Sequence, residues 1–218
     1  MSASHPQTHD LPRSGSLVPA WVKDAGRAVL APIVRLALAL HLTANTVTVI
    51  GLLIVIASAV LIGSGALMAG MLVLVGGSLL DAVDGALARA NGGGTPFGSF
   101  LDSTLDRAGE AIIYLAIAVY YLRGPDPTWP VLAAILALTG SFLVSYSRAR
   151  AEGIGVAAAI GLAPRTERIV LVAAGLGLAG LGFGQGLIGA LWIIAVLTAA
   201  TTVQRIWHVW RLTTANPR

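Results

Sequence analysis

The sequence predicts an all-α integral membrane protein, with six transmembrane helices and an amphipathic interfacial helix before them. Hydrophobic residues make up 56% of the 218 residues, only 11% are charged, and the mean hydropathy is +0.82. Soluble domains carry about 25% charged residues, so this composition excludes an ordinary soluble domain. Apolar stretches of about 20 residues, the length that crosses a bilayer, recur along the chain.

The chain before the first apolar stretch has two parts. Residues 1–17 are rich in Ser, His and Pro and lack the apolar run of a signal peptide, so we expect a disordered tail. Residues 18–40 mix aromatic, aliphatic and basic side chains, which is typical of a helix lying in the headgroup plane. We therefore expect one membrane domain over residues 18–212 and a short C-terminal tail at 213–218.

Six spans are expected between residues 45 and 210, because turn-forming Gly, Pro and Asn clusters separate the apolar stretches. The separators are Gly63–Gly65, Asn91–Pro96, Gly124–Pro127, Gly153–Pro164 and Gly182–Gly186. The expected spans, in order, are Asn45–Gly63, Ala66–Ala90, Phe97–Leu122, Trp129–Arg150, Glu167–Leu181 and Leu187–Trp210.

Positive charge predicts the orientation of these spans. If the N-terminus is cytoplasmic, all of the 14 Lys and Arg residues except Arg123 fall in or beside cytoplasmic segments, as the positive-inside rule requires. Both termini should then be cytoplasmic. The formal net charge of +4 suits contact with anionic membrane lipids rather than with nucleic acid.

Four aspartates, Asp81, Asp84, Asp102 and Asp106, stand near the cytoplasmic ends of the second and third spans. Carboxylates at bilayer depth are costly unless something compensates them, so the cluster indicates a functional site. The spacings of three and four residues place each pair on one helix face. Because a short glycine-rich turn makes the two helices antiparallel neighbours, we expect the two pairs to face each other.

Four converging carboxylates favour bound divalent cations, because mutual repulsion is relieved by positive charge. The chain has no cysteine, and an all-oxygen ligand set selects Mg²⁺, Mn²⁺ or Ca²⁺. Paired ions commonly clamp phosphate oxygens, so we expect two Mg²⁺ or Mn²⁺ ions and a phosphate-bearing substrate. The alternatives are a divalent-cation transporter, which would place its acids along a crossing path, and a structural membrane subunit.

The segment Asp81–Asp106 reads DAVDGALARANGGGTPFGSFLDSTLD. It resembles the signature of the CDP-alcohol phosphotransferase family, D-x2-D-G-x2-A-R-x8-G-x3-D-x3-D, at every fixed position. The resemblance implies a prokaryotic plasma-membrane enzyme, usually a homodimer, that transfers a phosphatidyl group from CDP-diacylglycerol to an alcohol and releases CMP.

The resemblance also assigns roles to particular residues. It implies that all four aspartates bind metal and that Asp106 is in addition the general base. Asn45 could approach the nucleotide or could simply cap the first span. The implied nucleotide-binding residues are Asn45, Asp81, Gly85, Ala88 and Arg89.

Arginines gather where the fourth span ends and the fifth begins. Their planar forks suit phosphate, although basic residues are expected at cytoplasmic span ends in any case. Arg205 differs because it lies within the last span, where a cation needs a partner. The set resembles the anionic pocket of prokaryotic phosphatidylinositol phosphate synthases, which implies inositol 1-phosphate as acceptor. A phosphatidylglycerophosphate synthase that uses glycerol 3-phosphate is the alternative. The set comprises Ser145, Arg148, Arg150, Arg165 and Arg205.

Overall fold

The structure is a computed structural model that describes residues 35, 39–40, 42–90 and 94–214, without the side chains at 79–82, 84–86 and 88–90. The predicted tail at 1–17 lies outside the described residues. So do the predicted interfacial helix, apart from residues 35, 39 and 40, and the chain from residue 215 on. These three predictions therefore stay predictions.

The described part of the chain folds into six long helices and contains no strand, which confirms the all-α prediction. Each expected span coincides with one helix. The largest difference is at the end of the last helix, which continues to Thr214 rather than ending at Trp210. The helices are α2 (Ala44–Ser64), α3 (Leu67–Ala90), α4 (Pro96–Leu122), α5 (Thr128–Gly153), α6 (Arg165–Gly180) and α7 (Gln185–Thr214).

Three of the six helices, α2, α5 and α7, are long and apolar enough to cross a membrane, judged over the described residues. Only about a third of the residues in these apolar stretches are buried inside the protein. Large apolar side chains such as Leu53, Val60 and Val196 point outward, which suits contact with lipid tails rather than water. The protein is therefore an integral membrane protein. Helices α3, α4 and α6 are shorter or carry the charged residues of the predicted site.

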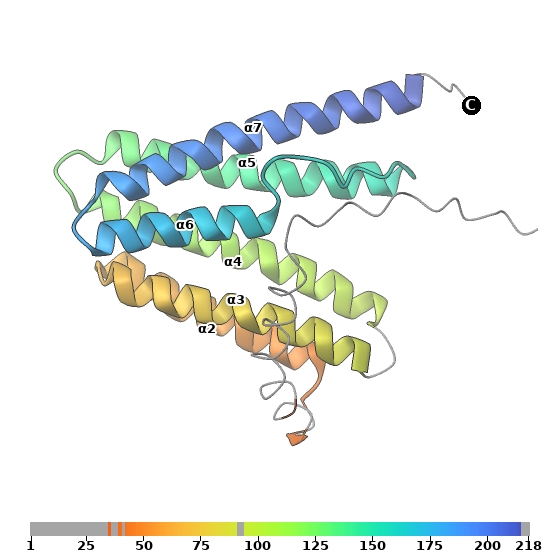
Figure 1. The fold of residues 1–218 in the computed structure, drawn as a ribbon, viewed down its shortest axis with the longest axis horizontal. Coiled ribbons are helices and arrows are strands. Elements are labelled where there is room, and N and C mark those ends of the chain that lie inside the picture. Colours follow the sequence, from red (N-terminus) through yellow and green to blue (C-terminus); the bar gives the residue numbers. More distant parts are fainter. Residues whose placement is uncertain (1–34, 36–38, 41, 91–93, 215–218) are drawn as a thin grey trace, which may run out of the picture.

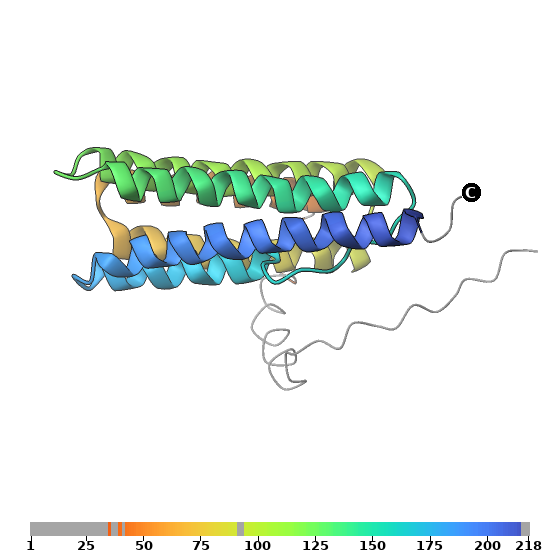
Figure 2. The ribbon, with the colours of Figure 1, turned by 90° about the horizontal axis from the view of Figure 1, so that it is seen from above.

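The helices form two layers of three, with their axes close to parallel or antiparallel (Figures 1 and 2). One layer holds α2, α4 and α5, and the other holds α3, α6 and α7. Contacts within the layers, and the α2–α3 and α5–α7 contacts at the edges, close the six helices into a ring. Helices α4 and α6 are the middle members of their layers and lie opposite each other.

Local sequence explains where α2 and α4 begin and where α2 ends. The Thr43 side chain accepts a hydrogen bond from the Thr46 N–H and caps α2, and Thr95 does the same for α4 through the Gly98 N–H. Pro96 follows as the first residue of α4, a position where its missing N–H leaves no bond unmade. Helix α2 ends at Ser64, and Gly65 follows it in a left-handed conformation, with a φ of 96°.

Small residues let neighbouring helices approach closely. A Cβ atom added to Gly140 of α5 would come within 2.0 Å of the Thr198 hydroxyl of α7. A Cβ at Gly175 of α6 would lie 2.8 Å from the Ala190 Cβ of α7. Small residues at helix contacts are typical of membrane bundles, in which close packing replaces the hydrophobic effect as the source of association.

The segment between α5 and α6, residues 154–164, folds back along α7 instead of crossing the end of the bundle (Figure 1). Side chains on one face of α7 bind its backbone. Thr201 accepts hydrogen bonds from the Leu162 and Ala163 N–H groups at 3.0 and 3.1 Å, and Arg205 donates to the Ile160 carbonyl at 2.8 Å. This segment therefore fixes where α6 begins.

Candidate active site

The end of the bundle at which α4 and α6 begin carries most of the predicted site; we call it the polar end. Along α4, Asp102, Asp106, Glu110 and Tyr114 follow one another at four-residue intervals, which places them on one ridge of the helix. Asp106, Glu110 and Tyr114 line a pocket between the two layers. The ridge therefore leads from the polar end into the core.

The pocket lies between α2, α3, α4 and α6 and has a volume of about 50 Å³. A single buried water needs about 10–15 Å³ in this measure, so the pocket has room for a few waters or a small polar group. Gly77 and Gly109 at its wall let α2 approach closely, because an added Cβ atom would lie 3.1 Å from the Ile54 Cγ2 atom and 3.3 Å from the Val55 Cγ1 atom, respectively. Its polar lining comes chiefly from acids of α4 and arginines of α6.

Asp106 and Arg165 form the outer of two ion pairs between α4 and α6. The Arg165 Nη1 atom lies 2.8 Å from the Asp106 Oδ2 atom, and the two side chains are 34% and 18% exposed. The sequence predicted a general base at Asp106 and a phosphate ligand at Arg165, and the structure brings the two together. Both remain accessible from the polar end.

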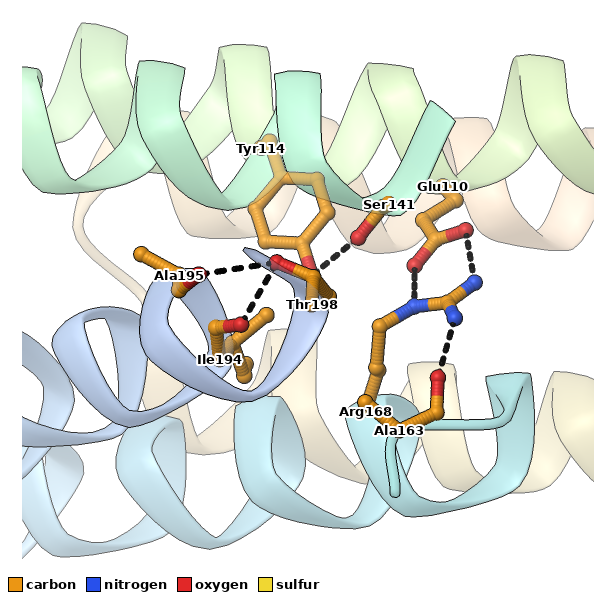
Figure 3. Close-up of polar contacts among 8 residues, drawn as sticks. All are labelled: Glu110, Tyr114, Ser141, Ala163, Arg168, Ile194, Ala195 and Thr198. Atoms are coloured by element: carbon orange, nitrogen blue, oxygen red, sulfur yellow. Dashed lines mark hydrogen bonds and ion pairs between the residues drawn. The ribbon is translucent and has the colours of Figure 1, made fainter. Parts of the chain in front are cut away.

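Glu110 and Arg168 form the inner pair (Figure 3), about one helical turn further along α4 and α6 than Asp106 and Arg165. The Arg168 guanidinium donates to both carboxylate oxygens of Glu110, at 2.7 and 2.8 Å, and also to the Ala163 carbonyl at 2.7 Å. The two side chains are only 9% and 2% exposed. Neither residue is among the site residues predicted from the sequence, although the spacing of four residues between Asp106 and Glu110 marks Glu110 as a member of the same ridge.

Asp81 and Asp84 lie in the C-terminal half of α3, but their side chains are outside the described part of the structure, as are those of Ala88 and Arg89. Among the described side chains, no three acids or histidines come together as a metal site. The facing of the two aspartate pairs therefore stays a prediction. Asp102 and Asp106, four residues apart on α4, carry carboxylate oxygens, the atom type that Mg²⁺ and Mn²⁺ prefer as ligands.

Asn45 does not cap α2, so the capping interpretation is wrong: the cap is Thr43. Asn45 instead lies beside the start of α4, where a Cβ atom at Gly98 would come within 3.0 Å of its side-chain oxygen. Gly98 is a fixed position of the aspartate motif, and this close approach is a physical reason for glycine there. The structure thus brings Asn45 to the polar end.

The remaining arginines predicted to bind the acceptor differ in their surroundings. Arg148 pairs with Glu152 on the exposed surface at 2.8 Å, and Arg150 is exposed. Arg205 is 5% exposed, and besides the Ile160 carbonyl it donates to the Val144 carbonyl. The partners that a cation in a span requires are thus backbone carbonyls. Ser145, next to Val144, is partly buried.

The sequence model of the CDP-alcohol phosphatidyltransferase family matches residues 41–210, the whole stretch from α2 through most of α7. The chain belongs to this family. The match covers the four aspartates, both ion pairs and the segment that binds α7.

Several curated members of the family are similar over most of their length. The archaetidylinositol phosphate synthase of Methanothermobacter thermautotrophicus is 38% identical over 78% of this chain and 84% of that protein. The phosphatidylinositol phosphate synthase of Mycobacterium marinum is 35% identical over 89% of this chain and 85% of that protein.

Solved structures of the Mycobacterium tuberculosis phosphatidylinositol phosphate synthase share the fold. The form with CDP-DAG bound has a TM-score of 0.77 and 34% identity, and the comparison covers 84% of this chain and 94% of that one. The form in complex with manganese and citrate has a TM-score of 0.78 and 35% identity, covering 82% and 88%. Membership of a transferase family decides against the cation transporter and the structural subunit.

Proposed function

We propose that this protein transfers a phosphatidyl group from CDP-diacylglycerol to inositol 1-phosphate, giving phosphatidylinositol phosphate and CMP. The observation that carries the proposal is the Asp106–Arg165 contact of 2.8 Å, because it sets a phosphate-binding cation beside the base implied by the family motif. The archaeal and mycobacterial relatives differ in the lipid part of their names but share the inositol phosphate part. This shared part supports the acceptor.

Asp81, Asp84, Asp102 and Asp106 are the proposed ligands of two divalent ions, Mg²⁺ or Mn²⁺. Their all-oxygen chemistry suits these ions, and the manganese complex of a related synthase supports a divalent metal. Such ions, when bound, neutralise the diphosphate of the donor and the charge that develops on the departing CMP.

Asp106 is the proposed general base. It takes the proton of the acceptor hydroxyl while the hydroxyl oxygen forms a bond to the phosphorus of the phosphatidyl group. The bond from that phosphorus to the CMP oxygen breaks, and CMP leaves with the electron pair. Since the acceptor phosphate binds the Arg165 guanidinium next to Asp106, the hydroxyl is held within reach of the base.

The other proposed ligands divide between the nucleotide and the acceptor. Asn45 of α2 lies beside the start of α4 and supports a nucleotide site there. The rest of that site is proposed at Asp81, Gly85, Ala88 and Arg89 on α3. The acceptor phosphate site is proposed at Ser145, Arg148, Arg150, Arg165 and Arg205.

We further propose that all six helices cross the plasma membrane of a prokaryote, with both termini and the polar end in the cytoplasm, and that the protein forms a homodimer. Arg123 supports the orientation, since it lies at the opposite end of the bundle and donates to the Gly63 carbonyl there. This placement lets the acyl chains of the donor stay in the bilayer while the nucleotide and acceptor enter from water.

Glycerol 3-phosphate is the second candidate acceptor, because the guanidinium groups recognise the phosphate and leave the polyol unspecified. Purified protein supplied with CDP-diacylglycerol and Mg²⁺ should be tested with inositol 1-phosphate, glycerol 3-phosphate, serine and free inositol. We expect CMP release with inositol 1-phosphate and little with free inositol, which lacks the phosphate. Release with glycerol 3-phosphate alone would overturn the acceptor assignment, and no metal-dependent release with any acceptor would overturn the proposed reaction.

A further inference from the structure

The inner ion pair, Glu110 and Arg168, has no role in the reaction proposed above. A buried ion pair is a weak source of stability, because the desolvation of both charges offsets their attraction. Apolar residues of similar size would fill the same space in a core that already contains Ile113 and Val172. The presence of a fully paired Glu and Arg therefore requires a reason other than the stability of the bundle.

Directional bonds supply that reason. The Arg168 fork is fixed in the plane of the Glu110 carboxylate by two bonds, and its remaining arm donates to the Ala163 carbonyl at 2.7 Å. The Ala163 N–H in turn donates to Thr201 of α7 at 3.1 Å. Ala163 is thus held from one side by α4 through Arg168 and from the other side by α7 (Figure 3 shows the Arg168 side).

Arg165 follows Ala163 by two residues and is the first residue of α6. Its N-cap residue, Pro164, makes no side-chain hydrogen bond to the helix. The hydrogen bonds of the Ala163 carbonyl and N–H groups therefore fix where α6 starts. Glu110 and Asp106 both belong to α4. The contacts of Glu110 with Arg168 therefore fix the start of α6, and with it Arg165, relative to Asp106.

We propose that Glu110 and Arg168 are positioning residues that hold the start of α6, through the Ala163 carbonyl, so that the Arg165 guanidinium stays at the acceptor phosphate site beside Asp106. The inference rests on the proposed function. An apolar pair in their place would keep the helices together but would leave the start of α6 free to shift, and a shift of about 1 Å at a substrate-positioning group is costly to turnover.

The test uses the full-length protein and two variants of the pair. In the double variant Glu110→Leu with Arg168→Met, no buried charge is left unpaired, so the bundle should stay folded. Arg168→Lys keeps the charge but loses the planar fork. Ser58→Ala is the control: Ser58 is a buried hydroxyl that donates to the Gly70 carbonyl between α2 and α3, away from the pocket.

We expect thermal unfolding of the double variant close to that of the wild type. We also expect its KM for inositol 1-phosphate to rise about 10-fold or more, the loss typical of one charge-assisted hydrogen bond. The KM for CDP-diacylglycerol should change little. Arg168→Lys should likewise raise the KM for inositol 1-phosphate and leave the KM for CDP-diacylglycerol nearly unchanged. Ser58→Ala should change neither KM.

A double variant with wild-type kinetics, or one in which both KM values change alike, would overturn the positioning role. If the double variant does not fold, the same measurement on Arg168→Lys decides: wild-type kinetics, or equal changes in both KM values, would overturn the positioning role. Absence of inositol 1-phosphate-dependent CMP release from the wild type would instead overturn the proposed function, and the inference with it.

Discussion

The two ion pairs between α4 and α6 differ in burial rather than in chemistry. Asp106–Arg165 and Glu110–Arg168 each join a carboxylate of α4 to a guanidinium of α6, one turn apart. The outer pair is open to the polar end, at 18% and 34% exposed, so a ligand can compete for either partner. The inner pair is sealed, at 9% and 2%, so its partners cannot exchange. Exposure therefore separates the pair suited to substrate from the pair suited to holding the helices in place.

The largest effect expected is on the outer acid. Asp106→Asn should lower the rate of CMP release by roughly 10²–10⁴-fold, the usual contribution of a general base, and by more if metal binding is also lost. Asp126→Asn is the matched control, since Asp126 is an exposed acid in the α4–α5 connection at the opposite end of the bundle. Retained turnover in Asp106→Asn would remove Asp106 as the base.

Breaking the inner pair by removing one partner should cost more stability than breaking the outer pair. Arg168→Met leaves the Glu110 carboxylate buried and unpaired, which should lower the free energy of unfolding by about 3–5 kcal/mol. Arg165→Met breaks the exposed pair and should lower it by less than about 1 kcal/mol. Thermal unfolding of the purified variants in one detergent measures the difference. Equal shifts for the two variants would contradict the distinction between the pairs.

The outer arginine should instead dominate acceptor binding. Arg165→Met should raise the KM for inositol 1-phosphate by roughly 10-fold or more, since a hydrogen bond to a charged group contributes about 1.5–3 kcal/mol. Arg148→Met tests an arginine that is more exposed and already paired with Glu152, and its effect on the same KM should be smaller. A larger rise in the KM for inositol 1-phosphate in Arg148→Met than in Arg165→Met would contradict the leading role of Arg165 in acceptor binding.

The sequence predicted the helices but not the order in which they pack. Apolar length and the turn residues between Gly63 and Gly186 determine where each helix lies, so all six were found close to their bounds. The order of the helices within the two layers depends on contacts between distant segments. Close approaches such as Gly140 against Thr198 can be seen only once the helices are placed.

The same limit explains what the sequence missed at the site. Asp106 and Arg165 were predicted, because a motif and a phosphate-binding residue type mark them. Glu110 carried only the weaker signal of its spacing from Asp106. The Ile160 carbonyl could not be predicted as a partner of Arg205, because that contact depends on residues 154–164 folding back along α7, a path that no local pattern encodes.

The central claim is that the carboxylates of α3 and α4 hold divalent ions together beside Arg165. Mn²⁺ binding, followed by electron paramagnetic resonance, tests it most directly in the wild type and in two variants, Asp81→Asn with Asp84→Asn and Asp102→Asn with Asp106→Asn. We expect the wild type to bind Mn²⁺ and each double variant to lose that binding, because neither helix supplies enough ligands alone. Unchanged binding in either double variant would contradict the claim.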